Sequence, residues 1–205
     1  MNMIIKYLHT FLFVVVFSSF SFAQGEWEKV KESYREILCH YPKALRDHFL
    51  DPDKANLIYL DISVPGVSNL NQLIAIFMCD SALITTIEEK AIQNAVAIYH
   101  FTDSCLMMVD YDSSFYDSTV IKLRQCNNFD EMVPIPNFEF CLKGPFPKEF
   151  YEKAKIYVLG AAKGKFLRDE LLWNQGVKLP KEWENGFTRG IVVSGNIAIY
   201  WLEIW

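Results

Sequence analysis

The chain has 205 residues with 20 basic and 25 acidic side chains, a formal net charge of −5. Its apolar content of 51% argues against intrinsic disorder, and its length suits one domain with a sizeable core. Because the chain is acidic and has no cluster of Lys and Arg, it lacks the phosphate-neutralising surface on which nucleic-acid binding depends.

The first 23 residues predict a secretory signal peptide. Lys6 supplies one positive charge, residues 11–17 (FLFVVVF) form a short apolar run, and Ser21-Phe22-Ala23 places small residues where a signal peptidase reads them. An uncleaved anchor is the alternative, but a bilayer requires about 20 apolar residues. We therefore expect residues 1–23 to be removed and residues 24–205 to form one domain, periplasmic or secreted, with no membrane span in the mature chain.

The first half of the mature chain predicts mainly helices. Helical spacing of apolar residues indicates a helix over residues 26–40, ended by Pro42, and a short one over 43–50. Residues 57–64 predict a strand that is apolar on both faces and therefore lies inside the sheet. Ser68 is expected to cap a helix that continues to Met78. The capping-box sequence at residues 86–89 opens another helix, which ends at His100.

The second half predicts strands and two further helices. Residues 104–111 and 119–125 have strand character, residues 127–136 form a loop, and residues 137–142 form a short edge strand. A helix starts at Pro147, since proline is tolerated at the first helical position. An apolar run over residues 156–159 ends in Gly160, and residues 165–173 are assigned to a helix.

The end of the chain predicts a β-hairpin. Two β-rich runs, residues 188–193 and 197–204, are joined at Ser194-Gly195-Asn196. The last run is apolar on both faces, so we expect a strand that is covered on both sides. The predicted fold class is α+β, a single domain whose mixed or mainly antiparallel sheet of about five to seven strands carries helices packed on it.

Five cysteines follow the leader, so at least one has no partner within the monomer. Cys39, Cys79 and Cys105 lie in apolar, periodic segments and are expected to behave as small buried hydrophobic side chains. Cys126 and Cys141 flank a loop and are the predicted pair if a disulfide forms. Closing that loop would stabilise the fold by about 3 kcal/mol in the chain-entropy model.

Two segments resemble ligand-binding motifs but miss essential positions. The stretch from Gly160 to Lys165 has three residues between its glycines where a P-loop has four, and Phe166 stands where Ser or Thr would bind magnesium. A strand-ending turn is favoured there. The acidic loop of residues 110–117 has Phe115 where an EF-hand requires Gly, so a solvated turn is favoured over a calcium site.

No catalytic or metal-binding signature is evident elsewhere. His40, His48 and His100 lack zinc-ligand spacing, and structural roles are expected for them. There is no Gly-x-Ser-x-Gly element, and a Cys–His catalytic pair is disfavoured because the cysteines are expected to be buried. We therefore expect no metal and no cofactor.

The segment that precedes the final hairpin is the best candidate binding site. Trp183, Phe187 and Arg189 lie close together in the sequence, and Gly186 and Gly190 in the same segment would let a ligand approach the backbone. Aromatic side chains beside a cation suit stacking on a sugar, a peptide or another planar ligand. The alternative is structural: the two aromatics close the end of the sheet and Arg189 extends to solvent.

The sequence favours an exported, non-enzymatic module that binds an unknown ligand or protein partner. The alternative is an envelope hydrolase with dispersed acid–base residues, because two carboxylates suffice for glycoside or peptide hydrolysis. The candidate carboxylates are Asp103, Asp110, Asp112 and Glu139. A third possibility is a subunit whose terminal hairpin packs against a second copy.

Overall fold

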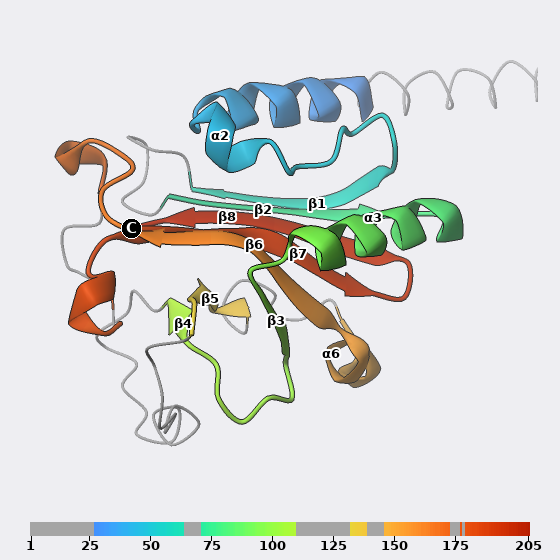
Figure 1. Ribbon diagram of the computed structural model, residues 1–205. Coiled ribbons are helices and arrows are strands. Elements are labelled where there is room, and N and C mark those ends of the chain that lie inside the picture. Colours follow the sequence, from blue (N-terminus) through green and yellow to red (C-terminus); the bar gives the residue numbers. More distant parts are fainter. Residues whose placement is uncertain (1–26, 64–70, 110–131, 139–145, 173–176, 178) are drawn as a thin grey trace, which may run out of the picture. The chain divides into compact units, whose positions relative to one another are not determined.

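The computed structural model describes residues 27–63, 71–109, 132–138, 146–172, 177 and 179–205 (Figure 1). The chain divides into two compact units between Cys39 and His40. In the first unit residues 27–39 form a helix, as the apolar spacing predicts, with an ion pair of 2.8 Å between Lys31 and Glu28. No helix among the described residues is long and apolar enough to cross a bilayer.

A six-stranded sheet forms the centre of the second unit. Every pair of neighbouring strands is antiparallel, and the spatial order is β1 (Asn56–Ser63), β2 (Asn71–Met78), β8 (Ile197–Ile204), β7 (Gly186–Ser194), β6 (Lys155–Lys163) and β3 (Ala97–His100). The predicted α+β class and the C-terminal hairpin of β7 and β8 are therefore confirmed.

Shorter elements complete the unit. The helices are α2 (Lys43–Arg46), α3 (Ser81–Asn94) and α6 (Lys148–Lys153), with 3₁₀ turns η1 (Asp169–Leu171) and η2 (Lys181–Trp183). β4 (Met108–Val109) and β5 (Ile135–Pro136) form a small parallel sheet. Figure 1 shows α2 on one side of the large sheet and the β4–β5 pair on the other.

The face of the sheet towards β4, β5 and α6 carries the main core. Trp201 of β8 is fully buried there, and its ring meets Phe138 edge-on at 5.4 Å between centroids. Gly190 makes this possible: a Cβ on it would lie 2.3 Å from the Trp201 ring and 2.2 Å from the Tyr157 carbonyl. The glycine thus lets the indole lie flat across β7. β8 is covered on both faces, as its sequence predicts.

The structure corrects the prediction that residues 57–64 form an internal strand. β1 lies at the edge of the sheet, and Ile58 and Tyr59 are 47% and 45% exposed. The register with β2 shifts between Leu57 and Tyr59, which makes Ile58 the extra residue of a bulge. After the bulge, the side chains of β1 alternate between the two faces of the sheet in the opposite phase. Apolar residues on both faces of β1 therefore do not mean that both faces are buried.

The predicted helix from Ser68 to Met78 is wrong, because residues 71–78 form β2. Residues 71–77 are all buried between layers, and a short apolar run of this kind cannot be assigned to helix or strand by periodicity alone. The next helix starts earlier than its capping-box sequence indicates. Asp80 is the N-cap of α3 and accepts a hydrogen bond from the Leu83 amide at 2.8 Å. α3 ends at Asn94, so His100 lies on β3.

Several other boundaries differ from the predictions. β6 continues through Gly160 to Lys163, the predicted helix over 165–173 is limited to the η1 turn, and α2 spans four residues. The helix predicted to start at Pro147 is present as α6, with Pro147 as its N-cap. Of residues 104–109 only Met108–Val109 is a strand. The strand predicted over 119–125 lies outside the described residues.

The cysteines also differ from expectation. Cys79 is free and buried, as expected, but Cys39 is exposed. Cys105 is disulfide-bonded rather than a free buried thiol, and its Sγ lies 3.4 Å from the Sδ of Met132. Sequence spacing could not reveal this, because a disulfide depends on which segments the tertiary fold brings together. The predicted pair of Cys126 and Cys141 lies outside the described residues.

Candidate functional site: a cleft over the central strands

A cleft of about 650 Å³ opens on the face of the sheet that carries α2. One wall is the segment 47–54 that follows α2, and the other is α3. The floor is made by Arg189 and Ile191 of β7 and Tyr200 of β8, with Leu159 of β6 beside them. Leu159 is the extra residue of a bulge in the pairing of β6 with β7.

The helical period of α3 gives its wall two chemical stripes. Leu83, Ile87 and Ala91 are spaced by four residues and form an apolar stripe, of which Ile87 and Ala91 are buried. The second stripe is polar and is shifted by three residues: Thr86, Lys90 and Asn94. Because both stripes line the cleft, a bound molecule would meet apolar surface and hydrogen-bonding groups on the same helix.

α3 is tied to the sheet through a carboxylate. Glu88 accepts hydrogen bonds from the Tyr157 hydroxyl at 2.6 Å and from the Lys155 ammonium at 2.9 Å. The hydrogen bond from Tyr157, followed by that from Lys155, lowers the pKa of Glu88, so its charged form is favoured. These bonds fix the rotation of α3 about its axis and therefore fix which stripes line the cleft.

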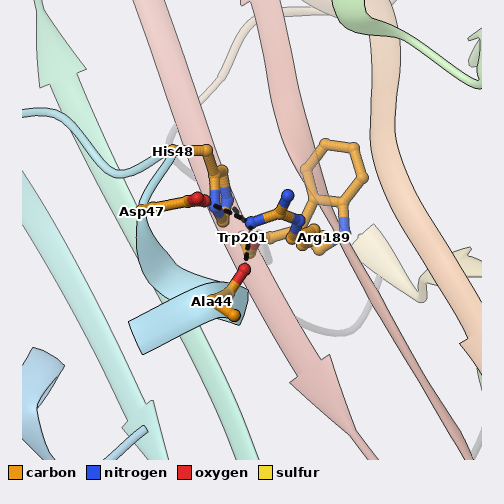
Figure 2. A network of polar contacts seen from close by, with 5 residues as sticks. All are labelled: Ala44, Asp47, His48, Arg189 and Trp201. Carbon is orange, nitrogen blue, oxygen red and sulfur yellow. Dashed lines mark hydrogen bonds and ion pairs between the residues drawn. The ribbon is translucent and has the colours of Figure 1, made fainter. Parts of the chain in front are cut away.

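The opposite wall is tied down by Arg189, as Figure 2 shows. Its Nη1 donates to the backbone carbonyl of Ala44 at 2.8 Å and to Oδ1 of Asp47. The Arg189 side chain is 20% exposed and that of Asp47 is 57% exposed. The contact joins the end of α2 to the middle of β7, and it places a charged pair at one end of the cleft.

His48 makes a second tie in the same wall. Its Nε2 lies 2.9 Å from the Trp201 carbonyl oxygen (Figure 2). Because a carbonyl only accepts hydrogen bonds, Nε2 carries the proton and Nδ1 has the lone pair. Burial lowers the pKa of His48 to about 4, although the Trp201 carbonyl partly opposes this effect. The imidazole is therefore neutral at pH 7.

Aromatic contacts complete this wall. Phe49 lies 6.0 Å from Tyr200 between ring centroids, and Tyr200 meets Phe77 edge-on at 5.6 Å. Tyr41, just before α2, donates its hydroxyl to the Gln72 carbonyl at 3.2 Å. Burial raises the pKa values of Tyr41 and Tyr200, so both phenols stay protonated. The wall is thus held on the sheet by hydrogen bonds and by tilted and edge-on ring contacts.

Two ammonium groups line the cleft from its two walls. Lys54 ends the segment 47–54 and Lys90 lies on the polar stripe of α3, and both residues are exposed. Within the described part of the chain neither lysine forms an ion pair. Asp51 also lines the cleft, and its Oδ1 accepts from the Asp53 amide at 3.1 Å. Cations therefore exceed anions in the lining of the cleft, whose floor includes the apolar side chains of Ile191 and Leu159.

The three side chains predicted as a binding site do not all line the cleft. Only Arg189 lines the cleft. Phe187, 8% exposed, packs edge-on against Phe166 at 4.6 Å. Trp183, 5% exposed, belongs to a buried cluster with Trp205. The Nε1 of Trp205 donates a hydrogen bond to the backbone carbonyl of Trp183 at 2.8 Å. Both aromatic side chains are therefore largely buried.

The other sequence candidates lie away from the cleft. Asp103 is in an exposed turn, where its Oδ2 accepts from the His100 amide at 2.7 Å. Asp110, Asp112 and Glu139 lie outside the described residues. Among the residues that the structure describes, no group of three His, Cys, Asp or Glu side chains could hold a metal ion.

Sequence reasoning identifies Arg189 but misses the walls of the cleft. The four-residue spacing of α3 is a usable signal, and it assigns residues 87 and 91 to the buried side of that helix. The segment 47–54 carries no comparable pattern.

Comparison with family models, with curated proteins and with solved structures finds no match.

Proposed function

We propose that the protein is an exported, non-enzymatic binding module that takes a small molecule into the cleft between segment 47–54 and α3. The observation that carries this proposal is the cleft itself. Its volume of about 650 Å³ lies within the range of about 300–1,000 Å³ that is typical of small-molecule sites. Apolar side chains of the floor and of α3 line it together with polar and charged groups of both walls, and polar groups in such sites fix the orientation of a ligand.

The chemistry of the cleft favours binding over acid–base catalysis. Arg189 and Asp47 engage each other, and the protonated nitrogen of His48 is held by the Trp201 carbonyl. These groups position a wall of the cleft, and Lys54 and Lys90 remain available to a ligand. The hydrolase alternative relies on four carboxylates, of which the structure describes only Asp103. Asp103 lies in a turn and does not line the cleft.

Export is supported by two independent features. Residues 1–23 have the charge, apolar run and cleavage pattern of a signal peptide. Cys105 is disulfide-bonded, and disulfides persist mainly in oxidising compartments such as the periplasm or the extracellular space.

Expression of the full chain in a Gram-negative bacterium tests the export proposal. We expect the protein in the periplasm or the medium, beginning at Gln24 and with Cys105 blocked against alkylation until a reductant is added. Cys79, whose pKa burial raises to about 11, should react only after unfolding. Retention in the cytoplasm with an intact N-terminus would contradict export. It would not affect the proposal that the cleft binds a small molecule, which is tested separately below.

A matched pair of threonine substitutions tests the cleft. Thr85 and Thr86 are neighbours on α3, both are exposed, and their hydroxyls donate to the carbonyls of Ser81 and Ala82. Only Thr86 lines the cleft. In ligand-observed NMR with a set of small aromatic fragments, Thr86→Trp should abolish binding that Thr85→Trp retains. Fragments that bind both variants as well as the parent would rule out the cleft as the binding site.

A further inference from the structure

The charge around the cleft differs from that of the whole chain. The chain carries a formal charge of −5, whereas three cations and two anions line the cleft. Asp47 is paired with Arg189, whereas Asp51 accepts from the neutral Asp53 amide and keeps its negative charge. Lys54 and Lys90 therefore outweigh Asp51 in the lining, so an anionic group is attracted to the cleft although the protein as a whole repels it.

Apolar side chains form another part of the lining. The stripe formed by Leu83, Ile87 and Ala91 runs along the wall made by α3, and Ile191, 5% exposed, lies on the floor. A molecule with its charged end at the ammonium groups would therefore place its other end on hydrocarbon. Each methylene removed from water would add about 0.8 kcal/mol of favourable transfer free energy, so the apolar part would supply much of the affinity.

Taking the proposed binding function as its basis, we propose that the cleft selects small apolar carboxylates. The carboxylate lies near the ammonium groups of Lys54 and Lys90, and the hydrocarbon part lies against the apolar stripe of α3. Neutral molecules of the same shape gain only the apolar contacts. The ammonium groups are exposed, so the selectivity they provide is moderate and is weakened by salt.

Octanoate and octan-1-ol are matched probes, because they share a hydrocarbon chain and differ in charge. Isothermal titration calorimetry at low ionic strength should show octanoate binding roughly fivefold to tenfold more tightly than octan-1-ol. In the double variant Lys54→Ala/Lys90→Ala the affinity for octanoate should fall to that for octan-1-ol, while the affinity for octan-1-ol stays unchanged. Raising the sodium chloride concentration to about 0.5 M should have the same effect on the parent.

The control for general charge effects is Lys148→Ala/Lys153→Ala on α6, which packs with the opposite face of the sheet. It should bind octanoate as the parent does. Equal affinity of the parent for the two probes, with no effect of the Lys54/Lys90 substitutions, would overturn the proposed selectivity. The binding function would still hold if Thr86→Trp blocked the binding of both probes. Failure of octanoate to bind the parent would overturn the selectivity, whereas the fragment experiment decides the binding function separately.

Discussion

Arg189 connects two segments that are 142 residues apart in the chain. Its guanidinium donates two hydrogen bonds, one to the backbone carbonyl of Ala44 and one to the Asp47 carboxylate. Because bonds from charged donors contribute more than neutral ones, this single side chain has an outsized effect on how segment 41–54 lies on the sheet. The sequence places Arg189 beside aromatics and suggests a ligand contact, while its partners in the fold show a positioning role at the edge of the cleft.

Arg189→Met keeps much of the side-chain volume and removes the donors. We expect a loss of about 1–2 kcal/mol in the free energy of unfolding, discounted because Asp47 is largely exposed. Arg168→Met is the control, since its ion pair with Glu170 has both side chains exposed, and it should cost less than about 0.5 kcal/mol. Urea unfolding of the two variants makes the comparison. Equal losses would mean that the Arg189 contacts contribute no more than a surface pair.

His48 makes the stability of the fold depend on pH. Its pKa is about 4 in the folded protein, against 6.5 for a histidine in a short unstructured peptide, which represents the unfolded chain. Between about pH 4 and pH 6.5 the unfolded chain therefore binds a proton that the folded protein does not. The free energy of unfolding is highest above about pH 6.5 and falls between about pH 6.5 and pH 4, by on the order of 2–3 kcal/mol from this group.

His48→Gln retains an N–H donor for the Trp201 carbonyl but has no proton to gain. The loss of stability between about pH 7 and pH 4.5, measured by urea unfolding, should be smaller in this variant than in the parent. His100→Gln serves as the control, because His100 lies on β3 and makes no contact with the cleft. An unchanged loss of stability in His48→Gln would show that His48 is not the buried neutral group described above.

At the scale of elements, a local sequence pattern predicts the secondary structure correctly only where a single type of element is compatible with that pattern. The final hairpin has a β-rich run on each side of a Gly-containing turn, and Gly195 adopts φ of +60° there. β2 has only an apolar run, and its strand conformation is decided by pairing with β1 and β8, which the run does not encode. The cleft depends on the same long-range pairing, because its walls belong to segments that the sheet brings together.

The close approach of Trp201 to β7 provides a test of the packing between elements. Gly190→Ala would place a Cβ 2.2 Å from the Tyr157 carbonyl oxygen and 2.3 Å from the Trp201 ring, and neither backbone nor a buried indole can yield easily. We expect a loss of about 3 kcal/mol in thermal or urea unfolding. Gly160→Ala is the control, because its nearest neighbour is the flexible Arg189 side chain at 3.2 Å. Similar stability of the two variants would contradict the packing described.

For the whole second unit, the two faces of the sheet have different roles. One face carries a continuous apolar core in which Trp201, Phe138 and Phe150 are buried. On the other face, segment 47–54 and α3 stand apart over Ile191 and Tyr200 and leave the cleft between them. The core can thus hold the strands in place while the other face remains available to a ligand. The α+β class, which the sequence predicts, is compatible with this arrangement but does not specify the cleft.

The most direct test of the central claim, that this cleft is the ligand-binding site, is a titration of ¹⁵N-labelled protein with the strongest-binding fragment. We expect chemical-shift changes concentrated at Thr86, Lys90 and Asn94 of α3 and in segment 47–54. Changes that are confined to α6 and the β4–β5 pair, on the opposite face of the sheet, would contradict the claim.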